Sequence, residues 1–419
     1  FFQQLYNTAD AMVVGRFVGK QALAAVGGST STLINLLVGF FVGLSSGATV
    51  VISQFYGARK ADKVHWAVHT SIAFSIIGGI AFMIIGLAGS PWALEAMKTP
   101  EDVMGHSVVY IRIYFLGIIV NLIYNMGAGI LRAVGDSRRP LYFLIASCFT
   151  NIALDILLVA VLGMGVAGAA IATAASQFVG GGVPLLYFAR PNRSLLRLGK
   201  TKLDSRALLK ACTNGSSELM TNLSSSLVTV LYNFQLMQLA GEDGIAAYGV
   251  IMYVNFIFIA IFIGYSIGSA PVVGYHHGAG NSTELKSLFR KSLLLVGAAG
   301  VALTVAAEAL ALPLTKIFVG YDAALLAMTC RGFRLYSLSF LLTGFNIFSS
   351  GFFTALNDGF VSAVISFLRT LVFQTAVVLV LPALMGTDGI WLAIVVAELL
   401  ALAVSAWFLW RKRGKYRYA

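Results

Sequence analysis

Two acidic residues lie inside long apolar runs of the sequence. Asp10 is in LYNTADAMVVG and Asp155 is in FTNIALDILLV. A carboxylate at the centre of a bilayer costs at least about 2.5–3.5 kcal/mol, so an acid kept there is a candidate for function. Asn151 precedes Asp155 by four residues and shares its face if the run is helical. Carboxylate, amide and hydroxyl oxygens together suit a small hard cation.

The same acids also fit a second chemistry. Two carboxylates in a cavity of low dielectric repel each other, so that one of them binds a proton near neutral pH. A bound cation or a proton could couple transport to an ion gradient. The alternative for each acid is a hydrogen bond between helices with no transported ion.

A third acid, Glu218, lies in the polar stretch NGSSELMTNLSSS. So many polar residues on a membrane helix suggest a water-filled cavity, where a carboxylate would attract cationic substrates. We assign Glu218, Asn222 and Tyr232 to this cavity, with a partly buried structural Glu218 as the alternative. Arg369 and Glu398 are expected to form an internal ion pair between neighbouring helices.

The composition places these residues in a helical membrane protein. The 419 residues are 58% hydrophobic and 11% charged, and the mean hydropathy is +0.85. A soluble protein carries about 25% charged residues, and a membrane barrel alternates apolar and polar positions, which this chain does not. The net charge of +12 therefore indicates basic cytoplasmic loops rather than a nucleic-acid surface.

A membrane helix needs about 20 apolar residues, and about twelve such segments can be counted. With the N-terminus in the cytoplasm, the inner loops and the tail hold 20 of the 29 basic residues. We therefore expect a multi-pass protein of the plasma (inner) membrane with both termini cytoplasmic. The predicted spans are 1–17, 23–56, 65–88, 106–134, 140–162, 166–188, 207–239, 245–277, 284–312, 325–356, 360–383 and 388–410.

The two halves of the sequence resemble each other at an offset of 221–222 residues. Gly19 recurs as Gly241, Asp136 as Asp358, and Gly165 as Gly386. Six spans per half give two copies of the same orientation, with substrate between them. We predict an N-terminal lobe (1–188), a cytoplasmic linker (189–206), a C-terminal lobe (207–410) and a basic tail (411–419). The short first span suggests that its start is missing.

Other chemistries find little support in the sequence. The three cysteines, Cys148, Cys212 and Cys330, are scattered in or beside apolar segments, and we interpret them as core residues. No phosphate-binding loop, nucleophile elbow or zinc-protease motif occurs. We expect no enzyme activity, no cofactor and no nucleic-acid partner.

Several segments, in order, resemble the MATE (multidrug and toxic compound extrusion) family, and NGSSELMTNLSSS resembles its MepA-like branch. The resemblance covers nearly the whole chain. Those segments are NTADAMVVGRFVGKQALAAVG (7–27), GATVVISQFYGARKADKV (47–64), ILRAVGDSRRPLYF (130–143) and TNIALDILLV with GMGVAGAAIATAASQ (150–177).

The resemblance implies an all-α antiporter of twelve helices in two six-helix lobes, related by a parallel pseudo-twofold repeat. Such a protein exports organic cations and drugs in exchange for Na⁺ or H⁺. The family pattern carries over a cation site in the N-terminal lobe, with Asn125 as a further polar neighbour. The site residues are Asp10, Asn151, Asp155 and Thr173. The tenth span has no acid, so the pattern of a second site in the other lobe is incomplete.

Three rivals remain. A lipid-linked-precursor flippase of the same superfamily would need a cationic cavity, whereas the charges here are mainly acidic. A major-facilitator transporter would need G-x-x-x-D-R-x-G-R-R between spans 2 and 3, where this chain has YGARKADKVHW. A membrane scaffold would not need repeats with buried acids. We expect a monomer in the lipid bilayer whose partners are small organic cations or drugs.

Overall fold

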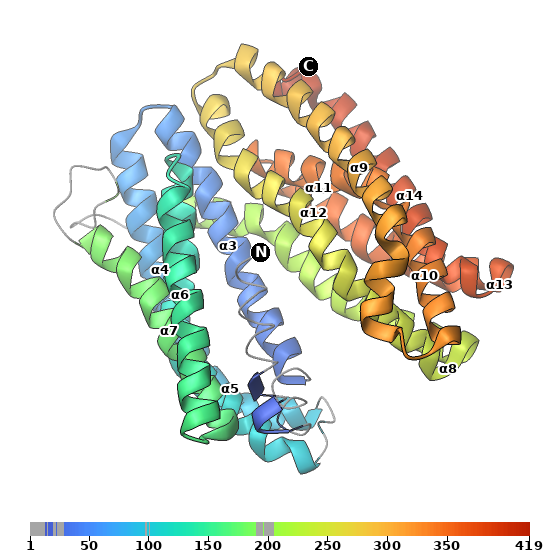
Figure 1. The fold of residues 1–419 in the computed structure, drawn as a ribbon. Helices are drawn as coiled ribbons and strands as arrows, with labels where there is room; N and C mark the ends of the chain where they lie inside the picture. The colour runs from blue at the N-terminus through green and yellow to red at the C-terminus, as the bar shows by residue number, and fades with distance from the viewer. Residues whose placement is uncertain are drawn as a thin grey trace. The chain divides into compact units, whose positions relative to one another are not determined.

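The computed structural model describes residues 13, 14, 16–19, 22, 29–96, 99, 101–189, 196 and 205–419. Within these residues every regular element is a helix (Figure 1). This follows from the composition, because a helix satisfies its backbone hydrogen bonds within one segment and needs no partner in lipid. The chain divides into two compact units, Phe1–Gly215 (unit 1) and Ser216–Ala419 (unit 2).

Unit 1 is built around α5, which packs against α3, α4 and α7. A π-helical segment, η1, continues α6 without a break. The helices are α3 (Ser29–Gly57), α4 (Ala61–Ala96), α5 (Glu101–Ala133), α6 (Arg138–Asp155), η1 (Ile156–Val161) and α7 (Gly165–Ala189).

Unit 2 holds most of α8 (Ser205–Gly278) and all later helices. The backbone of Gly241 is non-helical, with φ 63° and ψ −151°, and divides α8 into two helices. The remaining helices are α9 (Ser282–Val319), α10 (Ala323–Ser337), α11 (Phe340–Ala355), α12 (Gly359–Phe367), η2 (Leu368–Phe373), α13 (Gln374–Met385) and α14 (Thr387–Tyr416).

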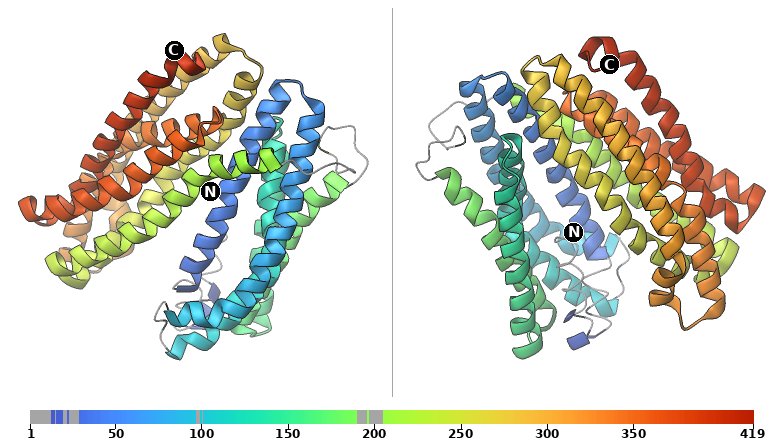
Figure 2. Two further views of the ribbon diagram at one scale, coloured as in Figure 1. Left: turned by 180° about the vertical axis from the view of Figure 1, so that it is seen from behind. Right: turned by 45° about the horizontal axis from the view of Figure 1, so that its top comes forward.

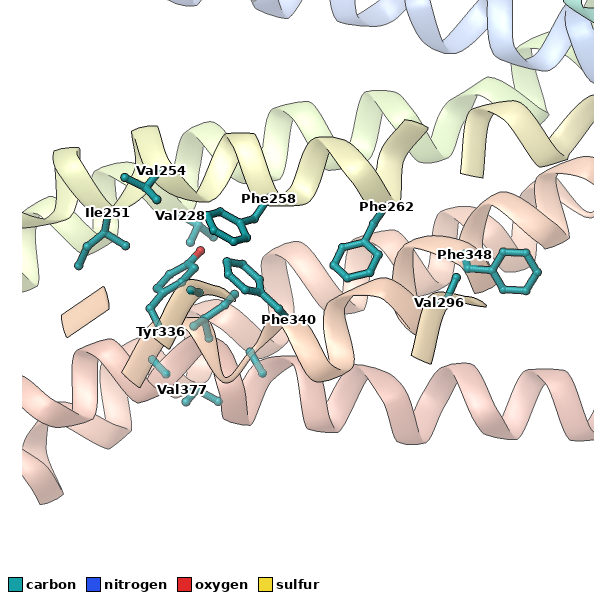
Figure 3. Close-up of a cluster of buried hydrophobic side chains, with 14 of the residues drawn as sticks. Val228, Ile251, Val254, Phe258, Phe262, Val296, Tyr336, Phe340, Phe348 and Val377 are labelled. Atoms are coloured by element: carbon teal, nitrogen blue, oxygen red, sulfur yellow. The ribbon is translucent and has the colours of Figure 1, made fainter. Parts of the chain in front are cut away.

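Aromatic rings fill much of the interior of unit 2. Phe258 of α8 stacks on Phe340 of α11, with ring centroids 5.2 Å apart and planes at 7°. Figure 3 shows these two rings beside Tyr336 of α10. Each large aromatic side chain buries much apolar surface. A stacked pair stabilises the fold by about 0.5–1.5 kcal/mol beyond the effect of that burial. This core fixes the two parts of α8 against α10 and α11.

Eight described helices, or nine with one bent pair, are long and apolar enough to cross a membrane. Most of their bounds lie within a few residues of the predicted spans, but α4, α9 and α14 extend further, and α8 covers two predicted spans that are divided at Gly241. The helices α4 and α9 contain Pro91 and Pro313. The span predicted for 325–356 is bent by 49° between α10 and α11. The predicted span 1–17 lies mainly outside the described residues. Of the predicted linker 189–206, the structure describes only Ala189, Leu196, Ser205 and Arg206.

The internal repeat is visible in backbone conformation as well as in sequence. Four turns with positive φ recur at the offset of 221–222 residues. Two of these pairs include a non-glycine residue, so the repeated conformation does not depend on a glycine at both positions. The pairs are Gly19 with Gly241, Arg59 with Gly280, Gly135 with Asn357, and Gly165 with Gly386. The two units therefore repeat one pattern of helices and turns.

Candidate functional site

The seam between α6 and α7 holds the described residues of the predicted cation site. Ser147 Oγ of α6 donates a hydrogen bond to the carbonyl of Ser176 on α7 at 2.8 Å. The two helices are joined by a short turn and run antiparallel. One helical turn from this contact, in opposite directions, reaches Asn151 on α6 and Thr173 on α7. The register therefore places Thr173 opposite Asn151, with Asp155 one further turn along α6.

All three side chains are buried. The exposed fractions of Asn151, Asp155 and Thr173 are 0%, 0% and 4%. The amide of Asn151 and the hydroxyl of Thr173 have no hydrogen-bond partner within the part of the chain that the structure describes. Buried polar groups are nearly always hydrogen-bonded in native proteins. These two groups are therefore disposed to bind an ion, a water molecule or a residue outside the described ranges.

The backbone changes from α-helix to π-helix directly after Asp155. In η1, the amide of Leu162 donates to the carbonyl of Leu157 at 2.9 Å, a bond that spans five residues. π-Helical turns are rare and occur frequently at functional sites. The π-helical turn is wider than an α-helical turn, and it lies directly beside Asp155.

An apolar cluster lies beyond the acid at this end of unit 1. Val159 of η1 packs in one cluster with Val166 and Ala169 of α7, Tyr110 of α5 and Val14 near the N-terminus. Such surroundings exclude water and strengthen any electrostatic interaction of a nearby carboxylate. Asp10, the other predicted acid, lies outside the described residues.

Asn125 has a different environment from Asn151. Its side-chain amide donates to the carbonyl and the side-chain oxygen of Asn121, both at 3.0 Å. Its own carbonyl accepts a hydrogen bond from Ser45 of α3 at 2.7 Å. The described contacts of Asn125 thus run along α5 and toward α3, and none of its recorded hydrogen bonds reaches the α6–α7 seam.

The sequence reasoning missed Gln177 on α7. It lies one turn beyond Thr173, is 7% exposed, and directs its Oε1 toward α5, where a Cβ on Gly117 would lie 3.3 Å from it. The signal was present, because Thr173 and Gln177 are four residues apart and share a face of the helix. Gln177 is thus a further buried polar side chain of α7, directed toward α5.

In unit 2, the first part of α8 carries a polar stripe along an otherwise apolar helix. Glu218, Ser225 and Thr229 are exposed, and Asn222 is half-buried. The hydroxyls of Ser225 and Thr229 donate to carbonyls one turn earlier in their own helix, both at 2.8 Å. Such a stripe is unfavourable against lipid, which offers no hydrogen bonds. The stripe is therefore suited to face water or other polar groups.

Tyr232, predicted with Glu218 and Asn222, lies instead in the core of unit 2. It is 2% exposed, and its ring stacks on Tyr248 with centroids 4.9 Å apart and planes at 7°. The hydroxyl of Tyr232 has no hydrogen-bond partner among the described residues. Among the three residues predicted for the cavity, Tyr232 alone is packed into the aromatic interior.

The predicted ion pair of Arg369 and Glu398 is confirmed. Arg369 Nη2 lies 2.8 Å from Glu398 Oε1, between η2 and α14. Glu308, which lies inside α9, is also paired: its Oε1 accepts a hydrogen bond from Ser337 at 3.0 Å, and Arg334 lies 3.9 Å from its Oε2. The buried Glu398 and the partly exposed Glu308 are thus each paired with an arginine of unit 2.

Comparison with known proteins identifies the family. The sequence model of the MatE family matches residues 1–157 and 219–380. The chain belongs to the MatE family. The match falls on both halves, as the internal repeat requires. Membership places the chain among membrane transporters rather than enzymes.

Relatives of this MatE protein include proteins named for drug resistance or export. The probable multidrug resistance protein YoeA of Bacillus subtilis is 32% identical over 310 residues, which cover 70% of this chain and 65% of that protein. YpnP of the same organism is 33% identical over 44% of this chain and 40% of its own length. The chain thus spans less than two thirds of both. The multidrug export protein MepA of Staphylococcus haemolyticus is 21% identical over 98% of this chain and 90% of that protein.

Solved structures establish the fold of this MatE chain. A crystal structure of MATE in complex with MaL6 has a TM-score of 0.93 and 22% identity, covering 100% of this chain and 94% of that one. An outward-facing multidrug resistance MATE family transporter of the MOP superfamily has a TM-score of 0.93, 23% identity and coverages of 100% and 93%. MATE structures have twelve helices in two lobes. The predicted all-α, two-lobed fold is therefore confirmed.

Proposed function

We propose that this chain is an antiporter that exports organic cations and drugs in exchange for H⁺ or Na⁺. The observation that carries the proposal is the buried seam of α6 and α7, with Asp155, Asn151 and Thr173 on facing sides. The names of relatives support the substrate class, because YoeA and MepA are described as a probable multidrug resistance protein and a multidrug export protein.

In this proposal the coupling ion binds at Asp10 and Asp155. Asn151 and Thr173 contribute neutral oxygens, a donor set that suits Na⁺ and also supports a protonated carboxyl by hydrogen bonding. Gln177 lies one turn further along α7, with its Oε1 toward α5. The neutral oxygens hold the site in shape, and the acids supply the charge that the ion neutralises.

The substrate binds through the polar stripe of α8 in the proposed mechanism. Glu218 attracts the positive charge of an organic cation, and Asn222 offers an amide to its polar groups. Tyr232 lies less than one turn beyond Thr229, the last residue of the stripe, and its ring stacks on Tyr248. It would contribute to binding through the shape of the aromatic core rather than by direct contact.

Antiport then requires that ion and drug favour different conformations of the protein. Ion binding at the α6–α7 seam favours the state that releases drug outside, and drug binding favours the state that releases the ion inside. Coupling of this kind is reciprocal and typically amounts to about 1–3 kcal/mol, or 5–150-fold in affinity. We place the protein in the plasma (inner) membrane as a monomer with both termini in the cytoplasm.

The test is efflux of a cationic dye from proteoliposomes under a Na⁺ gradient alone and a pH gradient alone. One gradient should drive efflux in the unaltered protein. Asp10→Asn and Asp155→Asn should each lower the gradient-driven rate at least about tenfold, within the usual range of coupling energies. Asp62→Asn, which changes an exposed acid at the start of α4, is the matched control and should leave the rate unchanged.

Two further measurements separate loss of coupling from loss of fold. The Asn variants should elute as the unaltered protein does and should still bind the dye, because amide and carboxyl have nearly the same shape. If both aspartate variants kept full gradient-driven efflux, the site would be assigned wrongly. If neither gradient moved the dye through the unaltered protein, coupled export of organic cations would be refuted.

A further inference from the structure

The C-terminal end of α14 is basic and carries two exposed Trp–Arg pairs. Trp407 and Trp410 are 46% and 63% exposed. The guanidinium carbon of Arg411 lies 5.0 Å from the ring centroid of Trp407, and that of Arg413 lies 5.5 Å from the ring of Trp410. We call these four residues the Trp–Arg face. Cation–π contacts of this kind hold each guanidinium over an aromatic ring while its remaining N–H groups stay accessible.

Side chains on the other side of the same helix end bind Asp358, which lies between α11 and α12. Lys412 Nζ and Tyr416 Oη both bind Asp358 Oδ2, at 3.2 and 2.7 Å. Tyr418 donates a hydrogen bond to the carbonyl of Leu409 at 2.7 Å. These contacts fix the rotation of α14 about its axis. The Trp–Arg face consequently points away from the rest of unit 2.

A second basic segment lies at the same end of unit 2. The ring of Tyr418 is 5.0 Å from that of Phe289, which belongs to the first turns of α9. Figure 1 and both views of Figure 2 show the C-terminus and the start of α9 at one end of the unit. Lys286, Arg290 and Lys291 of α9 are all exposed there. The end of the unit therefore presents basic side chains from two helices.

Along α14, apolar residues are followed by tryptophans and then by arginines, which is the order of groups from the interior of a bilayer to its surface. An apolar membrane span ends in two tryptophans, which prefer the level of lipid head groups. The arginines follow at once, at the depth where lipid phosphates lie. Clusters of basic residues directly beside a membrane span bind anionic lipids, with roughly 1 kcal/mol for each basic residue near the surface.

We propose that the Trp–Arg face, together with the basic start of α9, is a binding site for anionic phospholipid head groups. The arginines donate to the lipid phosphate, and the tryptophan rings lie against the glycerol and upper acyl chain. The site is independent of ion coupling and drug binding. It would make the stability of unit 2 depend on the lipid composition of the membrane.

The test uses tryptophan quenching by brominated lipids in vesicles that contain the full chain. Trp66 and Trp92 are exposed, so both are changed to Phe; Trp391 is 2% exposed and adds a constant signal. Brominated phosphatidylglycerol should quench Trp407 and Trp410 with an apparent affinity on the order of fivefold above that of brominated phosphatidylcholine. The preference should shrink in about 1 M salt, where charges more than about 3 Å apart are screened.

Matched variants decide whether the arginines make the site. Arg411→Gln/Arg413→Gln should bring the preference close to one, whereas Arg411→Lys/Arg413→Lys should keep most of it. Lys60→Gln/Lys63→Gln removes two exposed charges from unit 1 and should leave the preference unchanged. Elution profiles check that each variant remains folded.

Three outcomes would overturn the proposal. Equal quenching by the two lipids in the parent protein would show that there is no anionic-lipid site. An unchanged preference in Arg411→Gln/Arg413→Gln would place the site elsewhere. If inorganic phosphate changed the emission of Trp407 and Trp410 in detergent while the two lipids quenched them equally in vesicles, the face would bind free phosphate rather than lipid.

Discussion

Arg369 and Glu398 form a two-point contact inside unit 2. Arg369 Nε and Nη2 each lie 2.8 Å from Glu398 Oε1, and the side chains are 14% and 1% exposed. Asn346 Nδ2 donates to Glu398 Oε2 at 2.7 Å, and Ser405 Oγ donates to Asn346 Oδ1 at 2.9 Å. Each charge and amide is thus satisfied, and the network joins α11, η2 and α14.

The first prediction follows from the burial of this pair. Changing either partner alone leaves an uncompensated buried charge, which costs about 3–5 kcal/mol, whereas replacing both with apolar residues is often neutral. Arg369→Met and Glu398→Leu should each lower the thermal stability of the detergent-solubilised protein strongly. Arg369→Met/Glu398→Leu should recover most of the loss. A double variant that was as unstable as the sum of the single ones would show that the two residues do not act as a pair.

The second prediction concerns Asp358, in the turn between α11 and α12. Burial raises the pKa of its carboxyl, but the hydrogen bonds from Tyr416 and Lys412 and the charges of Lys412 and Lys415 outweigh it, so the pKa lies below its ordinary value. A lowered folded pKa stabilises the fold fully above the ordinary aspartate pKa, and this stabilisation is lost as the pH falls through the folded value.

The measurement compares the unaltered protein with Asp358→Asn across a pH series. The stability difference should be constant above the ordinary aspartate pKa of 3.8 and shrink progressively below it. Its size near neutral pH should be about 1.5–3 kcal/mol, the usual contribution of a hydrogen bond to a charged group. A difference that grew as the pH fell would contradict the assigned contacts.

Much of the fold follows from the sequence because apolar runs in a membrane protein have few alternatives. A run of sufficient length forms a helix, and glycine or charge marks its ends. Gly165 and Gly386 illustrate this, since both have positive φ directly at the start of a helix. The bend between α10 and α11 is different. It occurs at Leu338 and Ser339, where the sequence has neither proline nor glycine, so tertiary packing must decide it.

The candidate site was predictable in its residue types but not in its geometry. The spacing of Asn151 and Asp155 defines one face of α6, yet the register against α7 depends on the Ser147–Ser176 hydrogen bond. No pattern in the sequence predicts that contact. Likewise, Tyr232 and Glu218 lie on one helix, and only the stacking on Tyr248 shows that Tyr232 belongs to the core.

The third prediction compares two neighbouring glycines of α7. A Cβ on Gly181 would lie 2.3 Å from the backbone oxygen of Val120 on α5, whereas a Cβ on Gly182 would meet nothing within 4 Å. Gly181→Ala should therefore force α5 and α7 apart and cost about 1–3 kcal/mol. Gly182→Ala should be neutral or stabilise the helix by up to about 1 kcal/mol. Thermal unfolding of the two variants checks this, and equal melting temperatures would show that the helices are less closely packed.

The last prediction tests whether the polar stripe of α8 meets water. In a protein whose Cys148, Cys212 and Cys330 are replaced by alanine, Ser225→Cys lies on the stripe and Leu227→Cys lies on another face. Both positions are exposed. A charged, membrane-impermeant thiosulfonate reacts with the thiolate, which forms readily in water and poorly in apolar surroundings. The cysteine at position 225 should therefore react much faster than the one at 227.

Positions 225 and 227 are only two residues apart on α8. A difference in their reaction rates therefore reflects the face of the helix and not the distance along it. Thr229→Cys, one turn along the stripe, should behave as position 225 does, and Val230→Cys should behave as position 227 does. Denatured samples should react equally at all four positions, which excludes intrinsic differences between the thiols. If positions 227 and 230 reacted as fast as 225 and 229, the stripe would not be a distinct water-accessible face, and Glu218 would lose its support as a residue of the substrate cavity.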